Sequence, residues 1–133
     1  MDASGLPFKG PNQTAGQFLS DTIVARELKG VNFSYKPIYD SNLKNAGEAV
    51  LGQKSFIGPQ AFNPELIGKR SLFSKPLTQR QTAAWVQLHE DLHQRIFQRA
   101  AQSSKWRQLF KNPTAEHKYM DEVLNRYFQM RGW

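Results

Sequence analysis

The segment LHEDLHQ, residues 88–94, places two histidines four residues apart, with a glutamate directly after the first. On a helix His89 and His93 lie one turn apart on the same side, which is the spacing that two imidazole ligands of one metal ion require. Glu90 lies beside them and can polarise a water molecule bound to that metal. The chemistry that these residues suggest first is hydrolysis at a zinc ion.

The His-Glu-x-x-His spacing resembles the zinc-binding motif of the zincin peptidases, over these five residues only. The resemblance implies that His89 and His93 bind zinc, that Glu90 activates water, and that the edge strand of a sheet binds the substrate. Asp91 and Arg95 depart from the pattern, because zincin helices are uncharged around the motif. We also expect no such sheet in this chain.

The third metal ligand is absent from its expected place. The longer, metzincin form of the motif continues with a glycine and then a histidine, whereas this chain has Ile96 and Arg99 there. The chain's remaining histidine, His117, lies on the next predicted helix, and Glu116 or Glu122 stays open as a third ligand.

An apolar stripe along the same helix gives the histidines another interpretation. Its members recur at spacings of three and four residues: Trp85, Leu88, Leu92 and Ile96. His89 falls inside the stripe and His93 at its margin, while Gln87, Glu90 and Gln94 are predicted to point away. We therefore interpret His89 as a contact residue, and predict no catalytic residue, no metal ligand and no cofactor.

The chain has two halves of different composition. Residues 1–76 hold eight of the nine glycines and six of the seven prolines, which interrupt regular structure. We predict an extended, irregular docking segment over 1–76 and a helical hairpin over 77–133, with helices at about 79–111 and 115–131. The predicted fold class is mainly α with extended segments, a draped, turn-rich N-terminal half and no sizeable sheet.

Capping patterns predict where individual helices begin and end. In the first half, helices are expected from Thr14 to Gly30 and from Asp40 or Ser41 to Gly52, with a single turn after Asn63. In the second half the expected signals are a capping box of Thr78 with Gln81, a cap at Thr114, and a left-handed Gly132 that folds Trp133 back onto Phe128.

Charge and composition indicate an acidic partner. The chain has a formal net charge of +7 and no cysteine, and its N-terminus does not resemble a signal peptide. No segment is apolar enough to span a membrane. Residues 92–111 combine five basic residues with three aromatic ones and no acidic residue. Such a mixture suits an acidic protein surface or nucleic acid, but no nucleic-acid-binding motif is present.

These features predict a non-enzymatic structural accessory protein that joins components of a large acidic assembly. A protein lining ciliary or axonemal doublet microtubules, with tubulin as host, is favoured, and the location would be cytoskeletal. Alternatives are a supernumerary subunit of a mitochondrial respiratory complex, a basic ribonucleoprotein accessory and a zinc metallopeptidase. We do not expect a free monomer.

The residues predicted to contact the partner are the large apolar side chains together with neighbouring basic ones. They are Phe56, Phe62, Phe73, Trp85, Leu88, His89, Leu92, Arg95, Ile96, Arg99, Trp106, Phe110, Tyr127 and Trp133.

Overall fold

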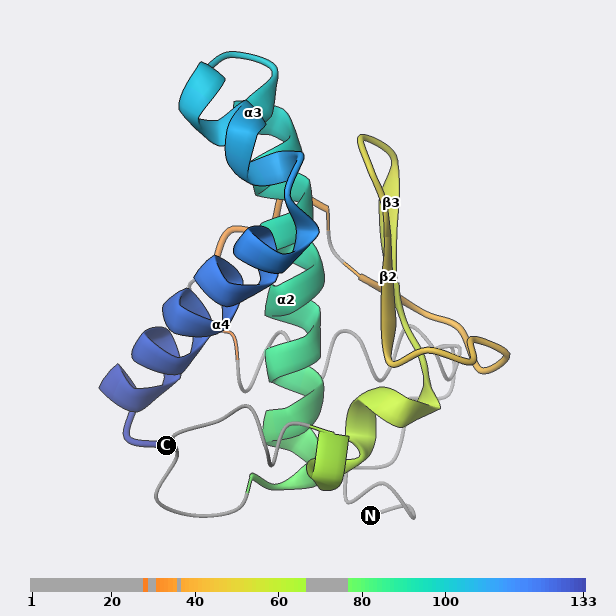
Figure 1. Ribbon diagram of the computed structural model, residues 1–133. Coiled ribbons are helices and arrows are strands. Elements are labelled where there is room, and N and C mark those ends of the chain that lie inside the picture. Colours follow the sequence, from red (N-terminus) through yellow and green to blue (C-terminus); the bar gives the residue numbers. More distant parts are fainter. Residues whose placement is uncertain (1–27, 29–30, 36, 67–76) are drawn as a thin grey trace.

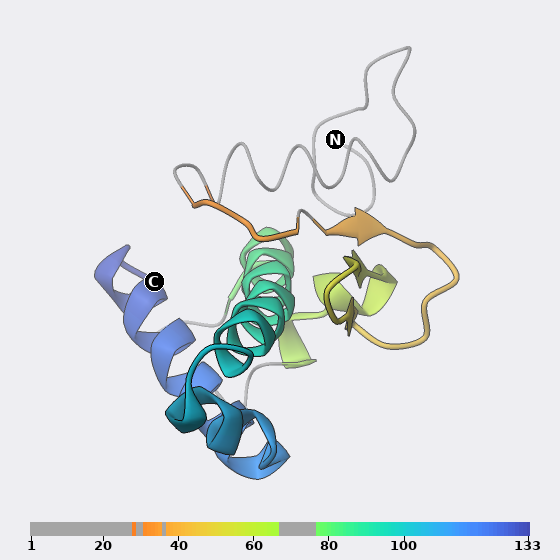
Figure 2. The same cartoon turned by 90° about the horizontal axis from the view of Figure 1, so that it is seen from above.

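The structure, a computed structural model, describes residue 28 and residues 31–35, 37–66 and 77–133. Within these ranges three helices follow a small sheet, so the predicted mainly α fold is confirmed. The central helix is α2 (Gln79–Ala100), with the sheet on one side and α4 (Pro113–Met130) on the other (Figures 1 and 2). No helix in the described ranges is both long and apolar enough to cross a membrane. The helix predicted from Thr14 to Gly30 lies outside the described residues, except for Leu28.

The N-terminus of α2 has the predicted capping box. Thr78 Oγ1 accepts a hydrogen bond from Gln81 N at 3.1 Å, and Gln81 Oε1 accepts one from Thr78 N at 3.0 Å. The helix predicted for residues 79–111 is interrupted at residues 101–103, after the end of α2 at Ala100. The chain continues there as the separate helix α3 (Ser104–Phe110).

The N-terminus of α4 differs from the prediction, because Asn112 caps the helix and Thr114 does not. The Asn112 side chain accepts a hydrogen bond from Ala115 N at 3.2 Å, and Pro113 occupies the first helical turn. A residue before proline is confined to extended backbone, and Asn112 has φ −117° and ψ 93°. This conformation suits the cap position, so the cap falls before the proline.

The C-terminus of α4 has the predicted left-handed ending. Gly132 has φ +87°, and Trp133 N donates to Phe128 O at 3.1 Å. The rings of Phe128 and Trp133 stack with centroids 4.2 Å apart. The predicted fold-back of Trp133 is confirmed.

The prediction of a helix from Asp40 or Ser41 to Gly52 was wrong. This part of the chain belongs to a small three-stranded sheet. β2 (Gly47–Val50) and β3 (Lys54–Ile57) form an antiparallel hairpin, and β1 (Ile38–Tyr39) pairs parallel with β3. The order β1-β3-β2 leaves β2 at an edge. Gly52 has φ +75° and reverses the chain within the hairpin turn.

Two short 3-10 helices follow the sheet and reach residue 66, the last described residue before residue 77. η1 (Pro59–Phe62) follows β3, and η2 (Pro64–Leu66) starts directly after Asn63, as the single turn predicted there. The Asn63 side chain accepts a hydrogen bond from Glu65 N at 3.1 Å, which fixes the start of that turn.

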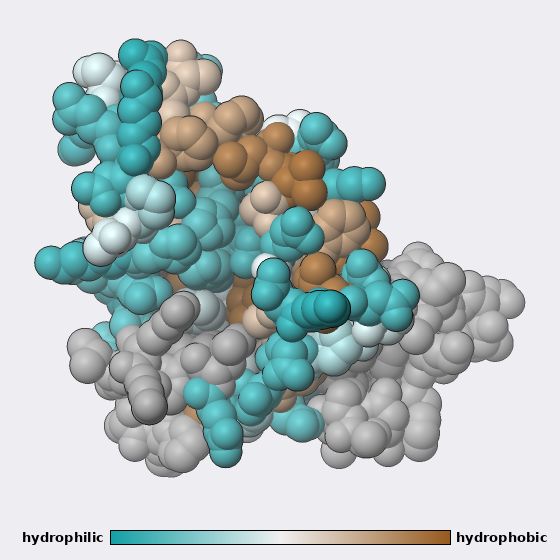
Figure 3. Space-filling view, turned by 45° about the vertical axis from the view of Figure 1, so that its right-hand side comes forward, coloured by the Kyte–Doolittle hydropathy of each residue, from teal (hydrophilic) through white to brown (hydrophobic). Residues whose placement is uncertain are grey.

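One hydrophobic core joins both halves of the chain. It consists of Leu28, Ile57, Ala61, Phe62, Leu77, Ala83, Ala84, Trp85, Val86, Leu88, Leu124 and Phe128. On the face shown in Figure 3, hydrophobic side chains also gather in a band across the upper part. Among the described residues, the exposed large hydrophobic side chains are Ile38, Phe97 and Met130. The described part of residues 1–76 thus packs on the helices instead of standing apart from them.

Buried polar side chains of α2 hold the first half of the chain in place. Fully buried Gln94 fastens the β2–β3 turn, because its Oε1 accepts from Gly52 N at 2.9 Å. Its Nε2 donates to Val50 O at 3.0 Å, Lys54 O at 3.1 Å and Ser55 Oγ at 3.2 Å. Four hydrogen bonds from one side chain therefore fix the hairpin against the helix.

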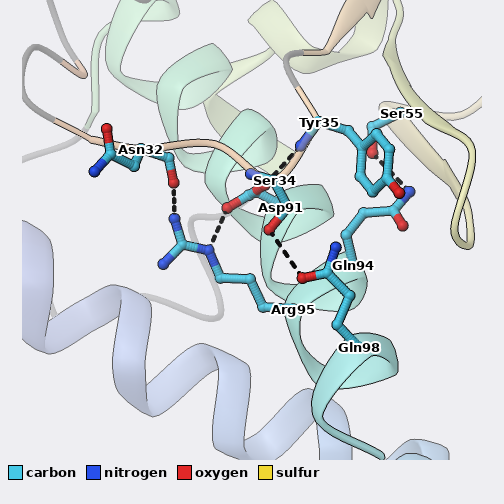
Figure 4. A network of polar contacts seen from close by, with 8 residues as sticks. All are labelled: Asn32, Ser34, Tyr35, Ser55, Asp91, Gln94, Arg95 and Gln98. Atoms are coloured by element: carbon cyan, nitrogen blue, oxygen red, sulfur yellow. Dashed lines mark hydrogen bonds and ion pairs between the residues drawn. The ribbon is translucent and has the colours of Figure 1, made fainter. Parts of the chain in front are cut away.

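On another side of α2, Asp91 holds the segment before the sheet (Figure 4). Asp91 is fully buried and accepts from Ser34 N at 2.7 Å and from Tyr35 N at 3.4 Å. Arg95 Nε lies 2.6 Å from Asp91 Oδ2, and Arg95 also donates to Asn32 O. The two charges next to the histidine motif thus anchor residues 32–35.

Gln94→Leu keeps the approximate volume of the side chain but leaves the hairpin turn without its polar partners. We expect a loss of about 1–3 kcal/mol in the free energy of unfolding, because buried donors and acceptors are left unsatisfied. Urea denaturation followed by circular dichroism measures this loss. Gln108→Leu, at an exposed position of α3, is the matched control. Equal stability of the two variants would show that the hydrogen bonds of Gln94 do not stabilise the hairpin against the helix.

Candidate metal centre

All three histidines of the chain come together in space. His89 and His93 come from α2 and His117 from α4, and one ligand atom from each lies within 4.8 Å of the others. Zinc bound tetrahedrally at about 2.0–2.1 Å needs nitrogens about 3.3 Å apart. Side-chain adjustments on the order of 1 Å therefore bring the three imidazoles to one metal ion.

Hydrogen bonds orient two of the rings for metal binding. His117 Nδ1 lies 2.8 Å from Pro113 O, and a carbonyl only accepts, so Nδ1 carries the proton. His93 Nδ1 lies 2.8 Å from Oε1 of Glu116, which is 6% exposed. In both rings Nε2 is left with its lone pair, and a carboxylate or carbonyl behind the imidazole is the usual support of a metal ligand.

Burial keeps His93 neutral. Burial, with a smaller contribution from neighbouring His117, lowers the pKa of His93 to about 4. Burial raises the pKa of Glu116, and the opposing effect of His117 is smaller. Both shifts disfavour a charged pair, so we describe His93 as a neutral imidazole that donates to Glu116. A neutral imidazole is the form that binds a metal.

Glu90 lies beside the histidines and is 6% exposed. Burial, followed by the charge of Glu48, raises the pKa of Glu90 to about 8. Its carboxylate has no hydrogen bond or ion pair to any residue in the described ranges. A divalent cation in the pocket would favour its ionised form. A buried acid without a partner is costly, and a functional site is one reason for a protein to keep one.

Gly47 of β2 makes room for Glu90. A Cβ atom at Gly47 would lie 2.7 Å from both Cγ and Oε1 of Glu90, closer than side chains tolerate. The missing side chain therefore lets the edge strand lie directly against the carboxylate.

An open pocket of about 620 Å³ contains the histidines and Glu90. Its walls come from the edge strand with its flanking residues, from α2 and from α4. The lining residues are Asn45, Ala46, Gly47, Glu48, Ala49, Leu51, Trp85, Val86, His89, Glu90, His93 and His117. This volume is in the range that holds small ligands or a few residues of a peptide.

The three departures from the zincin pattern look different in the structure. His117 occupies the place of a third ligand although it lies outside the motif. An edge strand, β2, does lie beside the motif. The charges of Asp91 and Arg95 are paired with each other and anchor the backbone of residues 32–35.

The prediction that Gln87, Glu90 and Gln94 point away from the packed side of the helix was wrong, because all three are buried. α2 is covered on several sides, so these three polar residues are buried along with most of its apolar stripe. Sequence reasoning also missed that His117 reaches the motif. The only signal was a third histidine four residues after Pro113, at the start of the next helix.

The residues predicted to contact a partner occupy three kinds of environment. Phe62, Trp85, Leu88, His89 and Ile96 are buried within the chain, and Leu92, Tyr127 and Trp133 pack against its core. Phe56, Arg95, Trp106 and Phe110 are half-buried, and Arg99 is exposed with its guanidinium over the Trp106 ring. Phe73 lies outside the described residues. Partner contact through these residues stays a prediction.

Comparison with known proteins assigns no family to this chain. No family model matches it, and neither the curated proteins nor the solved structures include a significant match. The interpretation of the site therefore depends on its geometry.

We expect the protein to bind one zinc ion per chain, and His117→Ala to abolish this binding. Changes to a residue that supports a ligand cost about 10- to 100-fold in affinity, so loss of a ligand should cost more. His117 is exposed, so its replacement should leave the fold intact. Isothermal titration with zinc chloride, together with elemental analysis, measures the affinity and stoichiometry.

Lys118→Ala is the matched control, because it changes the exposed neighbour on the same helical turn. The metal centre would be contradicted if the unaltered protein bound no zinc, or if His117→Ala bound it as tightly.

Proposed function

We propose that the protein is a zinc-dependent peptidase in which His89, His93 and His117 hold the metal and Glu90 is the general base. The observation that carries the proposal is the convergence of all three histidines in an open pocket, beside a buried glutamate that has no partner among the described residues. The zincin motif over residues 89–93 supports the same assignment.

The donor set favours zinc over other divalent cations. Three imidazole nitrogens suit zinc, whereas calcium and magnesium prefer oxygen ligands. In the described part of the chain the group consists of three ligands and no fourth. Three protein ligands with one open position are typical of catalytic zinc sites, while structural sites are closed by four.

Glu90 is placed to move the proton. A zinc ion held by His89, His93 and His117 would supply a Lewis acid and would lower the pKa of a water molecule in its open position. Glu90 accepts a proton from the attacking water and delivers it to the leaving amine nitrogen as the carbon–nitrogen bond breaks. His93 keeps its orientation through its hydrogen bond to Glu116.

An extended peptide is the substrate that the pocket suits best. β2 pairs with β3 alone among the described residues, so its other edge offers free backbone donors and acceptors along the pocket. Backbone pairing with an edge strand is a general mode of peptide recognition. The resemblance to zincin peptidases implies the same use of the edge.

The non-enzymatic accessory role stays a second proposal, and one observation favours it. Arg99, Lys105, Arg107 and Lys111 are all exposed around α3, away from the residues that line the pocket. Such a basic surface suits an acidic partner. The host assembly, whether an axonemal microtubule, a respiratory complex or a ribonucleoprotein, and the cellular location remain predictions.

Glu90→Gln should reduce peptide hydrolysis by the zinc-loaded protein at least about 100-fold, since a general base contributes about 10²–10⁴ to the rate. Zinc should remain bound at one ion per chain, because Glu90 is not among the proposed ligands. Cleavage of a mixed library of unstructured peptides, followed by mass spectrometry, measures the activity, and elemental analysis measures the metal.

Glu122→Gln is the control, since it makes the same chemical change at an exposed position of α4 outside the pocket. Unchanged hydrolysis by Glu90→Gln, or no zinc-dependent cleavage of any peptide by the unaltered protein, would refute the proposed function.

A further inference from the structure

The pocket is acidic although the chain is basic. The chain has 18 lysines and arginines against 11 aspartates and glutamates. The pocket lining nevertheless includes Glu48, Glu90 and the three histidines, and its described residues include neither lysine nor arginine. Among these described residues, an anionic group of a substrate, such as a carboxylate or a phosphate, would find no basic side chain to pair with.

Glu48 is the residue of this pocket that is free to contact a charged substrate. It lies on the edge strand β2 and is exposed. It forms no hydrogen bond or ion pair with any described residue. Lys54 lies nearby on β3, but its ammonium is held over the Phe56 ring, 5.5 Å from the ring centre.

Glu48 lies on a different element from the residues proposed to bind the metal. The histidines come from α2 and α4, whereas Glu48 comes from the strand that faces them across the pocket. Glu90 packs against Gly47, the residue before Glu48 on the strand. Glu90 would help to balance the charge of a divalent ion held by the histidines, and the Glu48 carboxylate is exposed and so would be accessible to a substrate.

We propose that Glu48 makes the site selective for substrates with an ammonium or guanidinium group close to the bond that is cleaved. The group is either the side chain of a lysine or arginine or the free α-amino group of the peptide. This inference rests on the proposed peptidase function and names its substrate class. Glu48 pairs with the cation, while the edge of β2 holds the peptide backbone.

The test compares quenched fluorescent peptides of one sequence, with Lys, Gln or Glu at each position flanking the cleavage site, on the full-length zinc-loaded protein. We expect kcat/KM to be about fivefold higher for Lys than for Gln, which is the size of a partly exposed ion pair. Glu peptides should be cleaved more slowly than Gln peptides. Peptides with free and with acetylated N-termini distinguish the α-amino group from the side chain.

Glu48→Gln should bring the Lys-to-Gln ratio of kcat/KM close to one, and Glu48→Lys should reverse the preference. Glu122→Gln is the matched control, because it changes the net charge equally outside the pocket and should keep the ratio. A ratio near one in the unaltered protein, or an unchanged ratio in Glu48→Gln, would overturn the selectivity and leave the peptidase proposal standing.

Binding separates the two proposals when cleavage fails. The dissociation constants of the same peptides with zinc-loaded Glu90→Gln, measured by fluorescence anisotropy, do not depend on turnover. No cleavage by the unaltered protein together with tighter binding of Lys peptides, lost in Glu48→Gln, would refute the peptidase and support the cation site. No cleavage together with binding independent of charge would overturn both.

Discussion

The structure depends on the hydrogen bonds and ion pairs that the buried polar side chains of α2 form. Asp91 and Glu90 are neighbours on this helix, and both are buried. Asp91 is satisfied by backbone amides of residues 34 and 35 and by Arg95, and it holds the chain against the helix. Glu90 has no such partner among the described residues. One acid thus stabilises the fold, and the other is the general base of the function proposed above.

Gln94 contributes both to the stability of the fold and to the formation of the candidate site. Its hydrogen bonds to the hairpin turn position β2 along the helix, so that Gly47 meets Glu90 and the edge strand forms one wall of the pocket. The opposite wall depends on α4, whose start at Asn112 and Pro113 brings Glu116 and His117 over α2. The candidate site is therefore a product of packing among all three layers of the molecule.

Features determined by near neighbours in the sequence were predictable. The capping box at Thr78 and the ending at Gly132 and Trp133 each depend on residues within a few positions of each other. The β2–β3 hairpin was missed because its anchor, Gln94, lies about 40 residues further on. Without that contact, the apolar spacing around Gly47 to Leu51 resembles a short helix.

The features of the site can likewise be divided into those set by near neighbours in the sequence and those set by distant contacts. The helical spacing of His89 and His93 was evident from the sequence, whereas the approach of His117 depends on the path of the chain between two helices. Glu90 was misplaced because a helical wheel assigns burial to apolar residues alone. In this protein the sheet covers a polar side of α2, so burial and polarity coincide.

X-ray absorption spectroscopy at the zinc edge of the zinc-loaded protein tests the metal centre most directly. We predict a four-coordinate ion with three imidazole nitrogens at about 2.0–2.1 Å and one oxygen from water. The multiple-scattering signal should indicate three histidines, which is every histidine in the chain. A shell of six oxygens, or a signal from fewer than three imidazoles, would contradict the account.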